Sequence, residues 1–377
     1  MIILFIKGLY QSVQIRLTLF LFGLLTPQKN QNQLVKKKLL SKKFNWRKNT
    51  QTKVFAIFSI SNWENAFLDP LSEFGELHHF SWPNAKEFFP GTKEWRVYYD
   101  QINTDLITSF NKLYDTTSNI LIFIYASDFS ISEATMQYLN KYNVLIVSFC
   151  WDDLLYFKGN VRGQPVGVSN LSRYADINLT MSPEAIPRYN FKGSPCFFWR
   201  SERVPGTKTD IHIKTAIDMP FYVLFIGSKY GWRTRFIEKL VWAGMPVKCY
   251  GAGWENGQLS HKEMKIAIGK APVTLGFANV GYTRNVTTLK GRDFEVPLYG
   301  GLYLTQYSEG LLRYYQPGKE VLTYRNFSEC LVQLKQIQAN REIADGIRAA
   351  GYQKASVYGS WQSRFAYLHQ LIYQTVE

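Results

Sequence analysis

The chain has 377 residues, 46% of them hydrophobic and 19% charged, which is typical of a globular protein with two or three domains. Its four cysteines, Cys150, Cys196, Cys249 and Cys330, are widely spaced, and its five histidines show no metal-ligand spacing. These patterns exclude a disulfide scaffold and a zinc ribbon, predict no bound metal, and fit a reducing compartment such as the cytoplasm.

The positive charge is concentrated at the N-terminus. The formal net charge is +15, and eleven of the 44 Lys and Arg residues lie in residues 1–53, which contain no Asp or Glu. The remaining 33 basic residues stand against 29 acidic ones, so the rest of the chain is only mildly basic. Because nucleic-acid proteins usually carry a basic face on the folded domain, this distribution disfavours a nucleic-acid partner.

Residues 1–52 are predicted to form an apolar and polybasic extension. Two apolar runs, 1–6 and 17–25, precede the segment KKKLLSKKFNWRKN. Neither run reaches the ~18–20 apolar residues that span a bilayer, and no signal-peptide cleavage pattern follows them. Two alternatives remain: residues 1–50 bind the anionic cytoplasmic surface of a membrane, or they form a disordered tail.

Residues 53–205 alternate short apolar runs with helix-like stretches. Strands are predicted at 53–60, 76–82, 119–127, 143–150, 175–182 and 195–200, and helices before Gly75 and over 101–115 and 131–141. This alternation predicts a Rossmann-like domain with a parallel sheet. The polar segment 201–220, which contains two prolines, is the predicted linker.

The alternation restarts in a second predicted domain, residues 218–358. Strands are predicted at 221–228, 246–251, 271–278, 301–306 and 319–324, and helices over 233–243, 260–269 and from about 291. Residues 328–377 are predicted to be helical, with breaks at Gly351 and near Gly359. Ligands of such sheets bind beyond the carboxyl ends of the strands, so we expect the site in a cleft between the two domains.

Two segments of the second domain carry residues suited to phosphate binding. In FIGSKYGWRTR (225–235), Gly227 and Ser228 follow a strand and Arg233 begins a helix. A glycine lets the backbone approach a phosphate, and a helix N-terminus offers free N–H groups. Turn geometry alone is the alternative explanation of this glycine.

The second segment is LKGRDFEVPLYGGLYLTQYSEG (289–310). It places Lys290 and Arg292 at a helix start, Glu295 one turn later, and Gly300 and Gly301 before a strand. Cations at a helix start can face a diphosphate, a glutamate can bind a ribose diol, and paired glycines let a ligand approach the backbone. An ordinary capped helix is the alternative.

Residues 223–367 resemble the spore-coat-maturation type of glycosyltransferase, which is related to the group 1 (GT-B) transferases. The matching elements are 225–254, the G-R-x-F-E-x-P-x-x-G-G core (291–301), P-G-K-E, and AAGYQKASVYGSWQSRF (349–365). The resemblance implies an α/β fold of two Rossmann-like domains facing a cleft. It also implies that the C-terminal helix, 359–377, crosses back to the first domain.

The resemblance further implies hexosyl transfer from a nucleotide-diphospho-sugar to a glycan, lipid-linked or protein acceptor. Glu295 falls where the family binds the nucleotide ribose, while Lys290, Arg292 and Arg233 would neutralise the diphosphate without a metal or other cofactor. The family often carries a second glutamate eight positions earlier, where this chain has Thr287. A catalytically degenerate nucleotide- or sugar-binding protein of the same fold is therefore the alternative.

An inverting transfer needs a protein group that accepts the acceptor's proton. Asp152 and Asp153 follow the strand 143–150 and are the first candidates, ahead of Glu64 after the first strand and of Asp128. A helix cap or a solvated turn is the alternative role for Asp152 and Asp153. A retaining transfer would need no such base.

Overall fold

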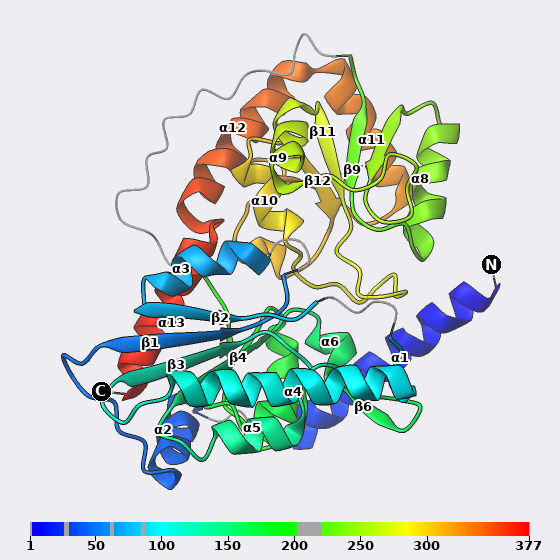
Figure 1. Ribbon diagram of the computed structural model, residues 1–377. Coiled ribbons are helices and arrows are strands. Elements are labelled where there is room, and N and C mark those ends of the chain that lie inside the picture. Colours follow the sequence, from blue (N-terminus) through cyan, green and yellow to red (C-terminus); the bar gives the residue numbers. More distant parts are fainter. Residues whose placement is uncertain (1, 26–29, 61–63, 84–87, 202–219, 377) are drawn as a thin grey trace. The chain divides into compact units, whose positions relative to one another are not determined.

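The computed structural model describes residues 2–25, 30–60, 64–83, 88–201 and 220–376, which form two compact units (Figure 1). Unit 1 comprises residues 1–14 and 201–366, and unit 2 comprises residues 15–200 and 367–377. Helices α1 (Ile2–Leu25) and α13 (Trp361–Val376) each contribute residues to both units. Residues 202–219, most of the predicted linker, lie outside the described residues.

Unit 2 is built on a six-stranded parallel sheet in the order β2-β1-β3-β4-β7-β8. Its strands are β1 (Thr52–Ile57), β2 (Glu76–Phe80), β3 (Asn119–Ile124), β4 (Leu145–Cys150), β7 (Ile177–Thr180) and β8 (Cys196–Phe198). Every residue of β3 and β4 is buried, as expected for central strands of a parallel sheet. The six predicted strands are thus confirmed, each shorter than predicted.

The helices of unit 2 are α2 (Gln31–Ser41), α3 (Leu68–Ser72), α4 (Lys93–Leu113), α5 (Glu133–Leu139), α6 (Asp153–Tyr156) and α7 (Ile186–Phe191). Helix α4 starts eight residues before the prediction because the Thr92 side chain accepts a hydrogen bond from the Trp95 N–H and caps it. The antiparallel hairpin of β5 (Lys158–Val161) and β6 (Gln164–Gly167) was not predicted.

The polybasic segment is partly folded onto unit 2 through α2. Val35 and Leu39 are buried, and Lys38 donates hydrogen bonds to the carbonyls of Arg173 and Ala175. Lys42 forms an ion pair of 2.5 Å with the fully buried Asp176. A disordered tail therefore does not describe residues 31–41. No described helix has both the length and the apolar composition needed to cross a membrane.

Unit 1 is built on a five-stranded parallel sheet in the order β10-β9-β11-β12-β13. Its strands are β9 (Val223–Ile226), β10 (Val247–Tyr250), β11 (Val273–Gly276), β12 (Tyr303–Gln306) and β13 (Leu322–Tyr324). Its helices are α8 (Trp232–Trp242), α9 (His261–Lys270), α10 (Arg292–Leu298), α11 (Phe327–Ala339) and α12 (Arg341–Tyr358). The two α/β units are Rossmann-like, as predicted.

The predicted helix break at Gly351 is wrong. Gly351 lies inside α12, where an added Cβ would lie 2.3 Å from the Glu320 carbonyl oxygen, so the glycine permits close approach of α12 to the turn before β13. The helical segment is interrupted instead at Asn340, between α11 and α12. The Asn340 side chain accepts a hydrogen bond from the Ile343 N–H and caps α12. The break near Gly359 is confirmed, since Gly359 ends α12.

Candidate functional site

The order of the strands in unit 1 singles out one edge of its sheet. The chain runs from β9 outward to β10 on one side and from β11 to β13 on the other, so the order reverses between β9 and β11. In sheets of this kind a ligand binds outside the carboxyl ends of the strands at the point of reversal. Gly227 and Ser228 follow β9 at this point, and Asn279 follows β11.

The backbone of Gly227 is already engaged within the protein. Its N–H donates to the Tyr250 carbonyl at 2.8 Å, and its carbonyl accepts from the Trp254 indole at 2.9 Å. An added Cβ at Gly227 would lie 3.0 Å from the Phe225 ring. These contacts favour the turn-geometry explanation for Gly227 and leave the exposed Ser228 as the accessible residue of this turn.

Arg233 joins the two sides of the reversal point. It lies at the start of α8, is 9% exposed, and its Nε lies 3.4 Å from the Asn279 Oδ1. Its guanidinium also lies over the Tyr230 ring, 4.3 Å from the centroid. Asn279 in turn forms a β-bridge with Thr287, the position where the family's second glutamate is replaced. Arg233 is thus held in place beside the carboxyl ends of β9 and β11.

The start of α10 lies at the same edge of the sheet. The chain leaves β11 at its carboxyl end, and α10 then runs back toward the amino end of β12, so the first turn of α10 belongs to the carboxyl edge. This turn carries Lys290, Arg292 and Glu295. Arg292 and Glu295 form an ion pair with each other, with side chains 26% and 14% exposed. The structure therefore couples two residues that the sequence suggested for separate parts of a nucleotide.

The buried Asp293 stabilises the first turn of α10 through hydrogen bonds. Its carboxylate accepts hydrogen bonds from the Lys290 N–H at 2.7 Å and from the Tyr303 hydroxyl at 2.9 Å. Burial raises the pKa of Asp293 to about 6, although both hydrogen bonds and the nearby Arg364 act in the opposite direction. Asp293 therefore fixes the backbone that presents Arg292 and Glu295.

Gly300 and Gly301 lie at the opposite edge of the sheet. They follow α10 and precede β12, and the Gly300 carbonyl faces the buried guanidinium of Arg348, which also donates to the carbonyls of Ala271 and Pro272 before β11. Gly300 has a φ of 72°, and a Cβ on Gly301 would lie 2.6 Å from Ile268 Cγ2. Both glycines are required by the turn and by packing, so the structure does not bring them together with the other donor-side candidates.

In unit 2 the strand order reverses between β1 and β3. Glu64 follows β1 in a short 3-10 helix, Tyr125 follows β3, and Asp152 follows the neighbouring β4. Burial raises the pKa of the Tyr125 phenol well above its usual value, and Cys150 and the carboxylates of Asp152 and Glu64 add to the shift. Glu64, Tyr125 and Asp152 thus follow three neighbouring strands at the carboxyl edge.

Asp153 is enclosed in the core of unit 2. It is 0% exposed and accepts a hydrogen bond from the Tyr189 hydroxyl at 2.9 Å, while Arg188 donates to its backbone carbonyl. Burial raises the pKa of its carboxyl to about 7. An acceptor hydroxyl cannot reach a group without exposed surface, so Asp153 supports the loop, whereas Asp152 is half-buried and within reach of solvent.

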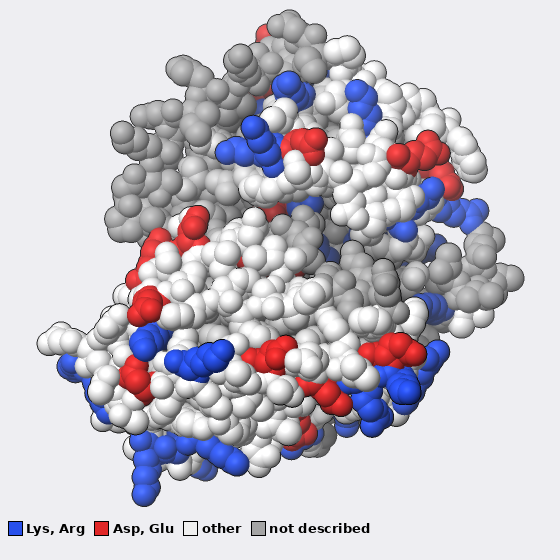
Figure 2. Space-filling model, in the orientation of Figure 1, with Lys and Arg blue, Asp and Glu red and all other residues white. Residues whose placement is uncertain are grey.

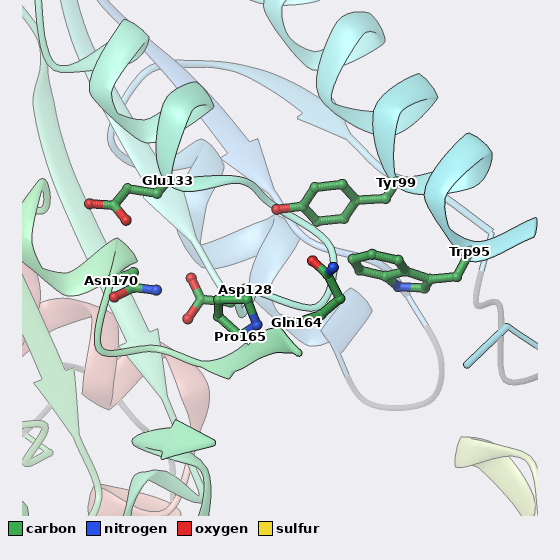
Figure 3. Close-up of a pocket in the computed structure, with 7 residues that line it drawn as sticks. All are labelled: Trp95, Tyr99, Asp128, Glu133, Gln164, Pro165 and Asn170. Carbon is green, nitrogen blue, oxygen red and sulfur yellow. The ribbon is translucent and has the colours of Figure 1, made fainter. Parts of the chain in front are cut away.

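Unit 2 also contains a cavity of about 120 Å³ (Figure 3). Seven residues line it, from α4, the loop after β3, the start of α5, and the hairpin with its following loop: Trp95, Tyr99, Asp128, Glu133, Gln164, Pro165 and Asn170. Burial, followed by the charge of Glu133, raises the pKa of Asp128 to about 7. The Trp95 and Tyr99 rings stack at 4.6 Å. Aromatic rings, carboxyl groups and amide groups thus line one small cavity.

Among the described residues, no three His, Cys, Asp or Glu side chains converge as metal ligands would. The comparisons with known proteins concern mainly unit 1. Residues 233–370 match the glycosyl transferase-like family. This glycosyl transferase-like segment includes Arg233, Lys290, Arg292 and Glu295. No curated protein sequence matches the chain at a significant level.

Solved structures of low sequence identity share the fold. Sucrose-phosphate synthase from Thermosynechococcus elongatus aligns with a TM-score of 0.56 at 13% identity, over 86% of this chain and 99% of that one. A glycosyltransferase from Rickettsia africae aligns with a TM-score of 0.53 at 9% identity, over 87% and 99% of the two chains. The N-terminal domain of Candida albicans trehalose-6-phosphate phosphatase aligns with a TM-score of 0.56 at 9% identity, over 88% and 99%. The chain has the GT-B fold.

Sequence reasoning missed the cavity of unit 2 and most of its lining. Asp128 was a secondary candidate, but Trp95 and Tyr99 lie in a helix whose start was placed too late, and Gln164 belongs to the unpredicted hairpin. The Thr92 cap was the available signal for the helix start, and the N-V-R-G turn was the signal for the hairpin. In the glycosyl transferase-like segment, Asn279 was the missed residue.

Proposed function

We propose that this protein is a glycosyltransferase that moves a sugar from a nucleotide-diphospho-sugar to an acceptor hydroxyl. The observation that carries the proposal is the match of residues 233–370 to the glycosyl transferase-like family, because this segment supplies the cations and the glutamate at the carboxyl edge of the unit 1 sheet. The finer resemblance, to the spore-coat-maturation type with hexosyl transfer, is part of the proposal. A glycan, a lipid-linked sugar and a protein are all acceptors compatible with it.

In this proposal the positive groups stabilise the leaving group. A sugar that leaves a nucleoside diphosphate develops positive charge at its anomeric carbon and leaves negative charge on the phosphate. Lys290, Arg292 and Arg233 would bind that phosphate, which lowers the barrier by electrostatic stabilisation. The nucleotide ribose would bind Glu295. With three cations at hand, the diphosphate is neutralised in this proposal without a metal or other cofactor.

Unit 2 would hold the acceptor. If the reaction inverts configuration, a carboxylate takes the proton of the attacking hydroxyl, and we assign this role to Asp152, with Glu64 as its neighbour. Asp128, whose pKa is about 7, would bind an acceptor hydroxyl in the cavity of unit 2. The four cysteines are buried and unpaired, which fits a cytoplasmic enzyme.

The first experiment measures thermal stabilisation of the full chain by UDP, GDP, dTDP, ADP and CMP and by the matching sugar nucleotides. Binding to the folded state raises the apparent melting temperature by mass action. We expect one base to give a shift that is lost in Arg292→Ala and kept in Lys335→Ala, a matched loss of an exposed cation on α11. The absence of a shift with every nucleotide would contradict the proposed donor site.

A measurement of donor turnover distinguishes a glycosyltransferase from a catalytically degenerate binding protein of the same fold. With the donor identified, release of the nucleoside diphosphate in the presence of candidate acceptors is expected to fall in Asp152→Asn while the nucleotide shift persists. Nucleotide binding without any release of nucleoside diphosphate, in the absence of acceptor and with each acceptor class, would favour a nucleotide- or sugar-binding protein. The replacement of the family's second glutamate by Thr287 is the observation behind that alternative.

A further inference from the structure

Helix α1 presents a continuous apolar face to solvent. Its exposed large apolar side chains range from 45% exposed for Leu21 to 68% for Leu24. They are Ile6, Leu9, Tyr10, Val13, Leu17, Phe20, Leu21 and Leu24. At 3.6 residues per turn these eight positions fall within an arc of about 120° that runs along five turns of the helix.

The opposite face of α1 is packed on the protein. Ile15 is 3% exposed, and the Phe22 ring meets the Phe191 ring edge to face at 4.9 Å. Nearer the N-terminus, Gln11 accepts a hydrogen bond from the Tyr282 N–H at 2.9 Å, and a Cβ on Gly8 would lie 2.4 Å from the Tyr282 carbonyl oxygen. The helix is thus held by one face while the other apolar face has no cover among the described residues.

The positive charges beside this apolar face favour an anionic lipid surface over a second copy of the chain as its binding partner. Lys7 and Arg16 are exposed and flank the apolar arc, one on each side, and α2 adds the exposed pair Lys36 and Lys37. Residues 1–53 contain no acidic residue. A second copy docked on this face would bring two such segments together and be opposed by repulsion, whereas an anionic lipid surface is complementary to both the apolar arc and the cations.

The body of the protein carries little excess positive charge. On the face shown in Figure 2, Lys and Arg are scattered among Asp and Glu and among uncharged residues. Residues 54–377 carry 33 basic and 29 acidic residues, so a general attraction to anions does not come from the body of the protein. Nucleic acid would pair with the lysines but not with eight exposed apolar side chains.

We infer that α1 is an in-plane membrane helix, which docks the protein on an anionic bilayer surface through the face formed by the eight exposed apolar residues. Lys7, whose ammonium lies over the Tyr282 ring 4.1 Å from its centroid, and Arg16 border the arc at positions that would face the lipid headgroups while the apolar arc enters the interface. Lys36 and Lys37 add electrostatic attraction. This inference is independent of the proposed sugar transfer.

The test uses the full chain and sedimentation with vesicles of phosphatidylcholine, alone or mixed with phosphatidylserine. We expect the chain to pellet with the mixed vesicles and to be released by high salt. The variant Leu17→Glu/Phe20→Glu is expected to lower the partition coefficient on the order of tenfold or more, because two charges enter the apolar arc. Its melting temperature should equal that of the parent, since both side chains are exposed.

The matched control is Val241→Glu/Trp242→Glu, which adds the same charge at two exposed apolar residues of α8. The inference is supported if this control pellets like the parent. It is overturned if the control is released as strongly as the α1 variant, or if the parent binds neither kind of vesicle. It is also overturned if the parent is a dimer that the α1 variant converts to a monomer, which would make a second copy the occupant.

Discussion

The ion pair between Arg292 and Glu295 leads to a prediction in which two ligands respond in opposite directions. If Glu295 binds the ribose and Arg292 the diphosphate, the pair must open when a nucleotide binds. Glu295→Gln removes the negative charge from the side chain that would accept hydrogen bonds from the ribose. The same substitution removes the ion-pair partner of Arg292. The variant should therefore lose affinity for the nucleoside and gain affinity for pyrophosphate.

The structure sets the magnitude of these changes. The two side chains are 26% and 14% exposed, so each makes its hydrogen bonds in a partly desolvated place. A hydrogen bond to a charged group is worth about 1.5–3 kcal/mol, which corresponds to roughly 10- to 150-fold in affinity. We expect a loss of about tenfold for the nucleoside in Glu295→Gln, and a loss of about tenfold or more for pyrophosphate in Arg292→Ala.

Isothermal titration calorimetry with three ligands checks the assignment: the nucleoside whose base the thermal panel selects, its diphosphate, and pyrophosphate. Lys335→Ala is the control, because it removes an exposed cation of α11 and should change none of the three affinities. If the nucleoside binds Glu295→Gln as tightly as it binds the parent, Glu295 does not contact the ribose. Its role would then be limited to positioning Arg292.

Three further predictions concern unfolding. Lys42→Met should lower the free energy of unfolding by about 3–5 kcal/mol, because it removes the ion-pair partner of the buried Asp176 and leaves its carboxylate the hydrogen bond from the Ile146 N–H; urea denaturation measures it, with Lys36→Met near zero as the control. Asp128 has a pKa of about 7 in the folded state, so between pH 4 and 7 the folded state binds more protons and stability falls as pH rises. Asp128→Asn should remove the part of that fall that Asp128 contributes, while Asp153 and Asp293, whose pKa values are also raised, keep theirs. A difference in the free energy of unfolding between parent and variant that is the same at pH 4 and pH 8 would contradict the assigned pKa. Gly301→Ala should cost about 1–3 kcal/mol through overpacking, with unchanged nucleotide affinity of the folded protein; weaker binding by the folded variant would return Gly301 to the donor site.

The order of strands and helices was predictable because each central strand is a short, continuous apolar run. The runs at 119–127 and 143–150 are buried at every residue of β3 and β4, and the turns between them follow the expected alternation. Positions near the ends of elements were less predictable. The start of α4 depends on the single side chain of Thr92, and the break at Asn340 depends on a cap that competes with the more conspicuous Gly351.

The sequence predicts which residues lie at the carboxyl edge of the sheet, because the direction of each strand determines the edge at which the following residues lie. Residues after β9, after β11 and in the first turn of α10 all lie at the carboxyl edge, as the parallel alternation implies. Gly300 and Gly301 are predicted as donor-side residues because paired glycines let a ligand approach the backbone. A pair that ends a helix and precedes a parallel strand, however, must lie at the amino edge. The contact between Arg292 and Glu295 also follows from sequence, since residues three apart on a helix are neighbours.

The polybasic segment shows why counting charges does not assign a role. Val35, Lys38, Leu39 and Lys42 recur at helical spacing and face unit 2, so two of the lysines serve folding and not a membrane. A truncation at residue 50 would remove the partner of Asp176 together with the apolar face of α1. Loss of vesicle binding in that truncation would therefore not distinguish an unfolded unit 2 from a missing membrane helix. Substitutions on the exposed arc of α1, which leave α2 intact, make that distinction.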